Sequence, residues 1–318
     1  MKAIQVLGSQ ENHHIVLSDA LSRPSPTGSQ VLIKVHAAGI TADEVIWPEL
    51  YASPNRVPGH DISGIVEAFG PEYHGPLSLG ESVYAMLHAD APHGGQSEYA
   101  IAMPNEVAVK PSSISHAQAA ALPIPALTAW EAIFKHTKLA QGSKIFVTGA
   151  SGAVGAMLVQ IARKFLNAEV IGLASPSNHA MLAELGATKV LDYSSPEWYA
   201  KVHGMDAVFD TVGGDIFSKS WRVVKENGYI VTVGDPAPKW AFGRGQPEEL
   251  QTYPNVKCLH FIVSPDGDAL SEVASLIDDG ALKPIPVQVF EVEEAVEAWK
   301  YASQRGRKGK AVIKFQAE

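Results

Sequence analysis

The chain has 318 residues, of which 46% are apolar and 19% are charged, proportions typical of a globular protein large enough for two domains. Its formal net charge of −9 argues against nucleic acid or an anionic membrane surface as a partner, and no run of 18 apolar residues is present to span a bilayer. The single cysteine, Cys258, excludes an intrachain disulfide and a cysteine-rich zinc site. Because the N-terminus has no apolar leader, we expect a cytoplasmic protein.

Up to Ser115, short β-branched runs alternate with Gly and Pro, a pattern typical of an all-β barrel. We expect strands at residues 30–40, 63–70, 81–87 and 97–102. Near Ser115 the pattern changes to an Ala-rich helical segment, which Pro123 and Pro125 interrupt.

From Lys144 onward, strands alternate strictly with helices, which predicts a parallel, doubly wound α/β sheet. Six strands are expected between Lys144 and Val263, the number found in a dinucleotide-binding Rossmann domain. The remaining residues suggest helices and a returning strand at 310–315.

The stretch "VTGASGAVG" follows a predicted strand and opens a predicted helix. Gly152 allows the backbone to approach a pyrophosphate, Gly155 allows close packing of helix on strand, and the helix N-terminus offers free N–H groups. Ala150 stands where the dinucleotide fingerprint has its first Gly. The alternative is a Gly-rich turn before a core helix, but the strand–turn–helix context favours a cofactor site.

The window "LASPSNH" at residues 173–179 bears on the choice of cofactor. NAD-binding domains carry an acidic residue there for the ribose 2′-OH, and this window has neither Asp nor Glu. Ser175, Ser177, Asn178 and His179 instead offer hydrogen bonds to a 2′-phosphate. We therefore predict NADPH over NADH, although the window lacks the Arg or Lys that a phosphate prefers.

The motifs "VPGHDISGIVEAFG", "AAALPIPALTAWEAIF", "VTGASGAVGAMLVQIA", "VFDTVGGD" and "GYIVTVG" together resemble the medium-chain dehydrogenase/reductase superfamily. The closest likeness is to the zinc-independent quinone oxidoreductase-like branch, which includes enoyl reductases. The resemblance implies a GroES-like β-barrel catalytic domain at 1–119 and 265–318, with a Rossmann domain at 120–264 inserted between its parts. By analogy with such folds, a homodimer is expected.

The resemblance also implies where the cofactor lies. The pyrophosphate would contact the glycine loop, the 2′-phosphate would lie by the second strand, and two later loops would line the far side and the nicotinamide. The implied contacts of the pyrophosphate are Gly149, Ser151, Gly152, Ala153 and Val154, and those of the 2′-phosphate are Ser175, Asn178 and Tyr193. The implied lining of the far side is Val212, Gly213 and Gly234, and the nicotinamide would lie near Phe261 and Val263.

Zinc-dependent members of the superfamily hold catalytic zinc with a Cys in "GxCxxD", the His of "GHE" and a later Cys or Asp. Here the first stretch reads "GITADE", with Thr41 in the Cys position, and His60 is followed by Asp61. Neighbouring strand residues point to opposite faces, so His60 and Asp61 do not form a ligand pair. No metal is predicted. His60 is then either a hydrogen-bonded histidine at a turn or a polar lining of the substrate or nicotinamide pocket.

Thr41 and Tyr51 match positions that lie near the nicotinamide and the substrate in the related reductases. Tyr51 would donate a proton or only shape the pocket. The predicted function is a zinc-independent, NADPH-dependent reductase of a small-molecule acceptor: a quinone, an enone or an enoyl thioester. The alternatives are a zinc-type alcohol dehydrogenase and a non-catalytic NADPH-binding sensor.

Overall fold

The computed structural model describes residues 1–91 and 93–316. The chain divides into two compact units, residues 1–127 with those from 264 onward, and residues 128–263. By this division residues 120–127 belong to the first unit, because Ala120 and Ala121 pack there with Ala37 and Val312. The domain limits given above stay a prediction.

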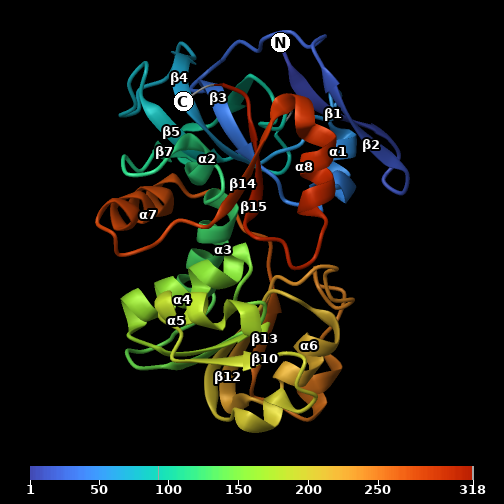
Figure 1. The fold of residues 1–318 in the computed structure, drawn as a ribbon, viewed down its shortest axis with the longest axis vertical. Coiled ribbons are helices and arrows are strands. Elements are labelled where there is room, and N and C mark those ends of the chain that lie inside the picture. The colour runs from blue at the N-terminus through green and yellow to red at the C-terminus, as the bar shows by residue number, and fades with distance from the viewer. Residues whose placement is uncertain (92, 317–318) are drawn as a thin grey trace. The chain divides into compact units, whose positions relative to one another are not determined.

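The first unit contains a seven-stranded sheet assembled from both ends of the chain. Its order is β14-β15-β3-β4-β5-β7, with β6 also paired to β3, and β1 and β2 form a separate antiparallel pair. In Figure 1 the red strands β14 and β15 lie beside the blue strand β3. The strands are β1 (Ala3–Gly8), β2 (His13–Ser18), β3 (Val31–Gly39), β4 (Asp61–Phe69), β5 (Ser82–Met86), β6 (Tyr99–Ala102), β7 (Val107–Val109), β14 (Val287–Glu291) and β15 (Lys310–Lys314).

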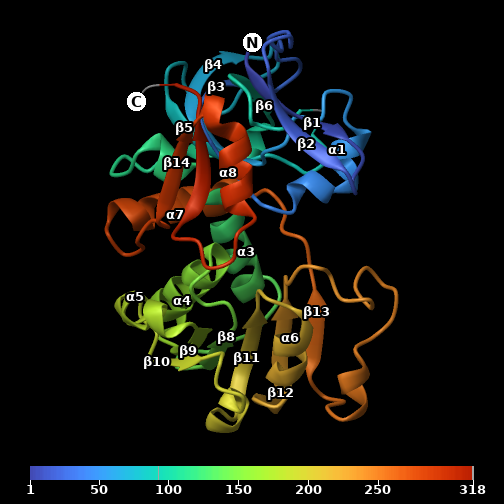
Figure 2. The ribbon, with the colours of Figure 1, turned by 45° about the vertical axis from the view of Figure 1, so that its right-hand side comes forward.

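Short helices cover this unit, and α8 is packed most clearly. It buries Ala298, Trp299 and Ala302 in a cluster with Ile4 and Ile313, residues from the two ends of the chain. Figure 2 shows α8 beside β14 and β15. The helical segments are η1 (Glu44–Ile46), α1 (Pro48–Ala52), η2 (Pro104–Glu106), α2 (His116–Ala119), α7 (Gly267–Asp278), η6 (Val292–Glu294) and α8 (Ala295–Ala302). Helix α3 (Pro123–Phe134) runs across the division between the units.

The second unit is a parallel six-stranded sheet with the strand order β10-β9-β8-β11-β12-β13. This is the order of a Rossmann sheet, so the predicted fold class is confirmed. The strands are β8 (Lys144–Val147), β9 (Glu169–Ala174), β10 (Lys189–Asp192), β11 (Met205–Asp210), β12 (Val224–Thr232) and β13 (Lys257–His260).

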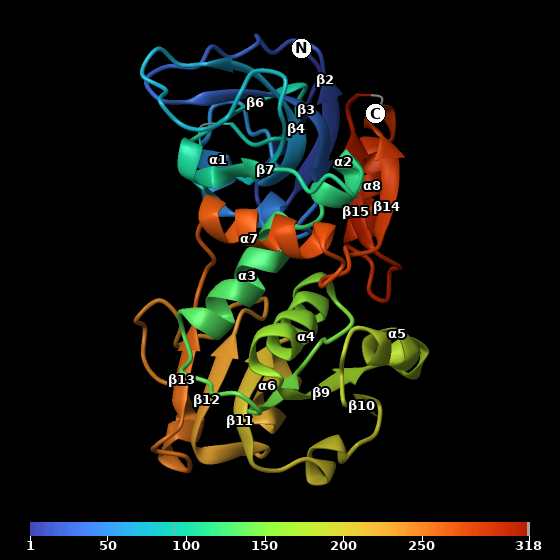
Figure 3. The same cartoon turned by 90° about the vertical axis from the view of Figure 1, so that its left-hand side faces the viewer.

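Helices flank this sheet, and Figure 3 shows α4 running along it. The apolar strand residues pack with Trp198 and Trp221, and Trp198 stacks on Phe146 with the ring centroids 5.2 Å apart. The helical segments are α4 (Ala153–Leu166), η3 (Pro176–Asn178), α5 (His179–Glu184), η4 (Trp198–Lys201), α6 (Gly214–Ser220) and η5 (Glu248–Gln251). Among the described residues of the whole chain, no helix combines the length and apolarity needed to cross a membrane.

Candidate active site

The glycine loop between β8 and α4 has the backbone shape that a pyrophosphate site needs. Gly149 adopts the left-handed conformation with φ +57°, and a Cβ on Gly155 would lie 2.3 Å from the Gly149 carbonyl oxygen. Gly152 is the N-cap of α4 and has no side chain to cap the first amides, those of Ala153 and Val154. The loop residue Ser151 is partly buried. Free N–H groups at the positive end of a 14-residue helix suit a dinucleotide phosphate.

Ala150, which stands where the dinucleotide fingerprint has its first Gly, packs against a glycine on the neighbouring strand β9. The Ala150 amide donates to the Leu173 carbonyl at 3.2 Å, which draws the loop against β9. There, a Cβ on Gly172 would lie 3.0 Å from the Ala150 Cβ, closer than methyl groups normally pack. The methyl group missing from β9 thus makes room for the one present in the loop.

A double-mutant cycle tests this match. Gly172→Ala is expected to destabilise the protein by about 1–3 kcal/mol through overpacking, and Ala150→Gly in the same chain is expected to restore most of that loss. Urea unfolding and cofactor titration of the wild type, both single variants and the double variant measure the coupling. Strictly additive effects would show that the two positions do not compensate.

A group of hydroxyl and amide groups follows β9, where an NAD-binding domain would carry an acid. Ser175 Oγ lies 3.1 Å from Ser177 Oγ and accepts a hydrogen bond from Asn178 Nδ2 at 3.0 Å. Tyr193, which follows β10, is 56% exposed. His179 Nε2 is buried without a hydrogen-bond partner among the described residues. The group offers donors and no carboxylate at the predicted 2′-phosphate position.

Asp210, at the end of β11, organises the loops predicted to line the far side of the cofactor. Its carboxylate is 1% exposed and accepts hydrogen bonds from Thr148 Oγ1 at 2.6 Å and Thr232 Oγ1 at 2.7 Å. It also accepts from the amides of Gly213 at 3.0 Å and Val212 at 3.4 Å. One carboxylate therefore joins the carboxyl ends of β8, β11 and β12. The sequence alone did not assign this role, although an Asp closing an apolar strand before "TVGG" was a signal for it.

The remaining predicted cofactor contacts follow β12 and β13. Gly234 packs so closely that its Cβ would lie 2.5 Å from the Gly213 nitrogen, and its own amide donates to Thr232 Oγ1 at 3.1 Å. Phe261 packs on His136 with ring centroids 4.4 Å apart, and Val263 ends the segment. Their part in cofactor binding stays a prediction.

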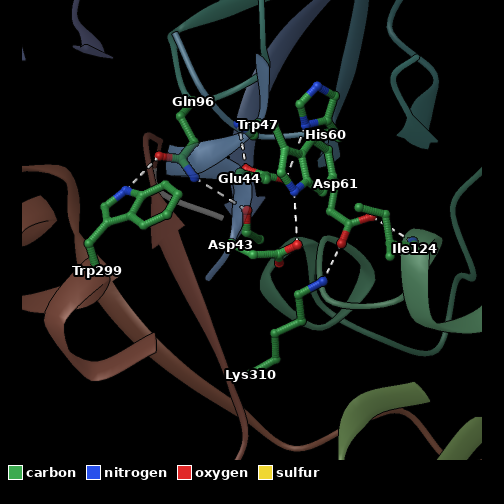
Figure 4. A network of polar contacts seen from close by, with 11 residues as sticks. Asp43, Glu44, Trp47, His60, Asp61, Gln96, Ile124, Trp299 and Lys310 are labelled. Carbon is green, nitrogen blue, oxygen red and sulfur yellow. Dashed lines mark hydrogen bonds and ion pairs between the residues drawn. The ribbon is translucent and has the colours of Figure 1, made fainter. Parts of the chain in front are cut away.

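In the first unit, His60 sits just before β4 in a buried polar network (Figure 4). Its Nδ1 lies 3.1 Å from Glu44 Oε1, and Glu44 Oε2 accepts from the Gly59 amide at 2.9 Å. Burial disfavours the imidazolium, but the charge of Glu44 and the hydrogen bond to its carboxylate outweigh burial and raise the pKa of His60. Glu44 was not among the predicted residues, yet it is the last position of "GITADE", where zinc-type members carry an acid.

Asp61 belongs to a second part of this network. Its carboxylate forms an ion pair with Lys310 of β15 and accepts the Ile124 amide, at the start of α3, at 2.6 Å. The Asp61 and Lys310 side chains are only 1% and 5% exposed. Gly39 makes this approach possible, since a Cβ there would lie 3.3 Å from Lys310 Cε and 3.1 Å from Asp61 Cβ. Asp61 is thus fully committed to protein partners.

Thr41 and Tyr51 lie on either side of η1. The Thr41 carbonyl accepts the Glu44 amide at 3.1 Å, so Thr41 begins the turn that carries the partner of His60. The Tyr51 hydroxyl lies 2.9 Å from the Val45 carbonyl oxygen and 3.2 Å from that of Ser9, and burial raises the pKa of Tyr51. The structure therefore brings Thr41 and His60 into one network, while the Tyr51 hydroxyl donates to the backbone.

Across residues 1–91 and 93–316, no three or more His, Cys, Asp or Glu side chains gather in a way that would hold a metal ion. Cys258 lies in β13, and burial raises the pKa of its thiol.

Comparison with known proteins agrees with this architecture. Residues 27–113 match the model of the alcohol dehydrogenase GroES-like domain, and residues 185–313 match that of the zinc-binding dehydrogenase family. A protein of Arthroderma benhamiae named "probable zinc-binding oxidoreductase, mitochondrial" is 31% identical over 92% of both chains.

Two further relatives match most of this chain. The chloroplastic NADPH-dependent alkenal/one oxidoreductase of Arabidopsis thaliana is 28% identical over 91% of this chain and 73% of its own length. The solved structure of the quinone oxidoreductase from Coxiella burnetii superposes with a TM-score of 0.85, covers 99% of each chain and is 28% identical.

All three relatives are named as oxidoreductases, and the name of the Arabidopsis protein includes NADPH. The glycine loop and the uncapped start of α4 fit a nicotinamide cofactor. The chain therefore belongs to the medium-chain dehydrogenase/reductase superfamily, as a quinone oxidoreductase-like member.

Proposed function

We propose that the protein is a zinc-independent, NADPH-dependent reductase of a conjugated carbonyl acceptor: a quinone, an enone or an enoyl thioester. The observation that carries the choice of cofactor is the group at Ser175, Ser177 and Asn178, which has hydroxyl and amide donors and no carboxylate after β9. The names of the Arabidopsis and Coxiella relatives support the classes of cofactor and acceptor. A cytoplasmic location and a homodimer remain parts of this proposal.

Zinc independence is supported by the residue types at the zinc positions. Thr41 has no thiolate, and a catalytic zinc needs three protein ligands. Among the described residues, His60 belongs to no group of three or more His, Cys, Asp or Glu side chains that could hold a metal ion.

When bound, the nicotinamide would supply the hydride, and the residues of the chain would bind and orient the cofactor and the acceptor and exclude water. The uncapped amides of α4 would hold the pyrophosphate, and Asp210 would keep the far loops in place. Thr41 and Trp47 would border the acceptor. Because the Tyr51 hydroxyl already donates to Val45, acceptors that take their proton from water suit this site best.

Steady-state oxidation of NADPH and NADH over a panel of quinones, enones and enoyl thioesters tests the proposal. We expect kcat/KM to be about tenfold or more higher with NADPH, and the activity to survive treatment with a chelator. A preference for NADH would refute the cofactor assignment. About one zinc per purified chain would favour the alcohol dehydrogenase alternative. Flat rates over the whole panel combined with tight NADPH binding would favour the sensor.

A further inference from the structure

A buried carboxylate holds the histidine that remains at the zinc position. His60 is 6% exposed and Glu44 is 1% exposed, and His60 Nδ1 lies 3.1 Å from Glu44 Oε1. This contact fixes the orientation of the His60 ring.

The face of the His60 ring, however, contacts a residue that is only partly buried. Trp47 lies against it with ring centroids 5.1 Å apart and planes inclined by 35° (Figure 4). The indole edge is fixed as well, because Trp47 Nε1 donates to Asp43 Oδ2 at 2.8 Å. An aromatic ring offset over a cation or another ring is held in one orientation.

Glu44 ties the same histidine to the segment that carries the indole. Its amide donates to the Thr41 carbonyl at 3.1 Å, and its carbonyl accepts the Trp47 amide at 3.1 Å. The side chain of Glu44 binds His60 while its backbone holds both ends of the turn. Disturbing His60 would therefore move Trp47 through the ring contact and through the backbone.

We propose that His60 is a positioning residue: held at Nδ1 by Glu44, its ring keeps the Trp47 indole in place as a rigid wall for a planar, conjugated acceptor. This inference rests on the proposed function, because it assigns Trp47 to the acceptor side of that reaction. An indole fixed on one face presents a flat apolar surface on which a quinone or enone stacks without ordering a flexible side chain.

The test compares His60→Gln, Trp47→Leu and the double variant with His14→Gln, a matched exchange at an exposed histidine of β2. His60→Gln keeps a donor for Glu44 but loses the ring. We expect it to raise the acceptor KM about tenfold and to leave the NADPH dissociation constant within about twofold, as Trp47→Leu should. The double variant should be no worse than the poorer single variant, and His14→Gln should behave as wild type.

A spectroscopic measurement separates this idea from the proposed function. Acrylamide quenching of Trp47, taken as the difference between chains with and without Trp47→Phe, should increase in His60→Gln. This readout needs no acceptor, so it still tests the positioning of Trp47 by His60 if the panel finds none that is reduced. Unchanged Trp47 quenching, or fully additive effects of the two substitutions on KM, would overturn the proposal.

Discussion

Replacing Lys310 with Met is expected to destabilise the barrel unit by about 3–5 kcal/mol, because it leaves the buried Asp61 carboxylate with the neutral Ile124 amide, and no cation, among its partners in the described residues. Asp61→Asn is expected to cost a similar amount for the opposite reason. It preserves an acceptor oxygen for the Ile124 amide. It also leaves the ammonium group of Lys310, which is 5% exposed, without its anionic partner.

The double variant, Asp61→Asn with Lys310→Met, is the informative control. It removes both charges and keeps an acceptor for the Ile124 amide, so we expect it to be more stable than either single variant. Hydrogen exchange of the amides in β3 and β15 reports on the barrel unit itself, since those strands pair there. If the double variant lost the sum of the two single losses, the pair would not act as a unit.

The matched surface exchange is Lys308→Met, two residues earlier in the same basic run. Lys308 is exposed and has no ion pair among those found in the described residues. Surface substitutions of this kind change stability by about 0.5 kcal/mol or less. A comparable loss in Lys308→Met would mean that charge in this segment, rather than burial beside Asp61, sets the stability.

The basic run at residues 305–310 contains a contact that the sequence alone does not predict. "RGRKGK" has the composition of a solvated loop, and its first residues are indeed exposed. Lys310 differs only because β15 pairs with β3 and brings it to Asp61, 249 positions earlier. The residues around Lys310 in the sequence do not indicate which residue will pair with it. That partner is set by the topology of the sheet.

The glycine loop, by contrast, could be predicted from the sequence. Its shape depends on local backbone geometry, and the positions of Gly149, Gly152 and Gly155 indicate that geometry. The alternation of strands and helices likewise predicted six parallel strands, since periodicity is a local property. What escaped prediction at this site was again a contact between elements, the space that Gly172 leaves for Ala150.

Tyr51 and His60 illustrate why a side chain's role is harder to read than its fold. Both residue types carry protons, so both were candidates for catalysis. In the structure the Tyr51 hydroxyl donates to the Val45 carbonyl, and the His60 Nδ1 is engaged by Glu44. Hydrogen-bond partners of this kind follow from loop conformation, which residue identity does not determine.

Asp210→Asn is expected to weaken binding of the nicotinamide cofactor by about tenfold or more and to cost about 1–3 kcal/mol of stability. The reason lies in the donors around the carboxylate. Thr148 and Thr232 can turn their hydroxyl groups to face an amide, but the backbone N–H groups of Val212 and Gly213 cannot. In either orientation of the introduced carboxamide, its NH₂ group would face the backbone N–H of Val212 or of Gly213. Two donors cannot form a hydrogen bond with each other.

The loop would then have to move away from the end of β11. Gly213 and Gly234 pack so closely that no side chain fits between them. A displacement of the Gly213 backbone would therefore also displace that of Gly234. Titration of the protein with NADPH, followed by cofactor fluorescence, measures the loss of affinity directly. Asp215→Asn is the matched control: Asp215 is exposed in α6, and within the described part of the chain its carboxylate forms an ion pair with Lys219, so that variant should bind as wild type. Wild-type affinity in Asp210→Asn would show that the far loops hold their shape without a carboxylate at their centre.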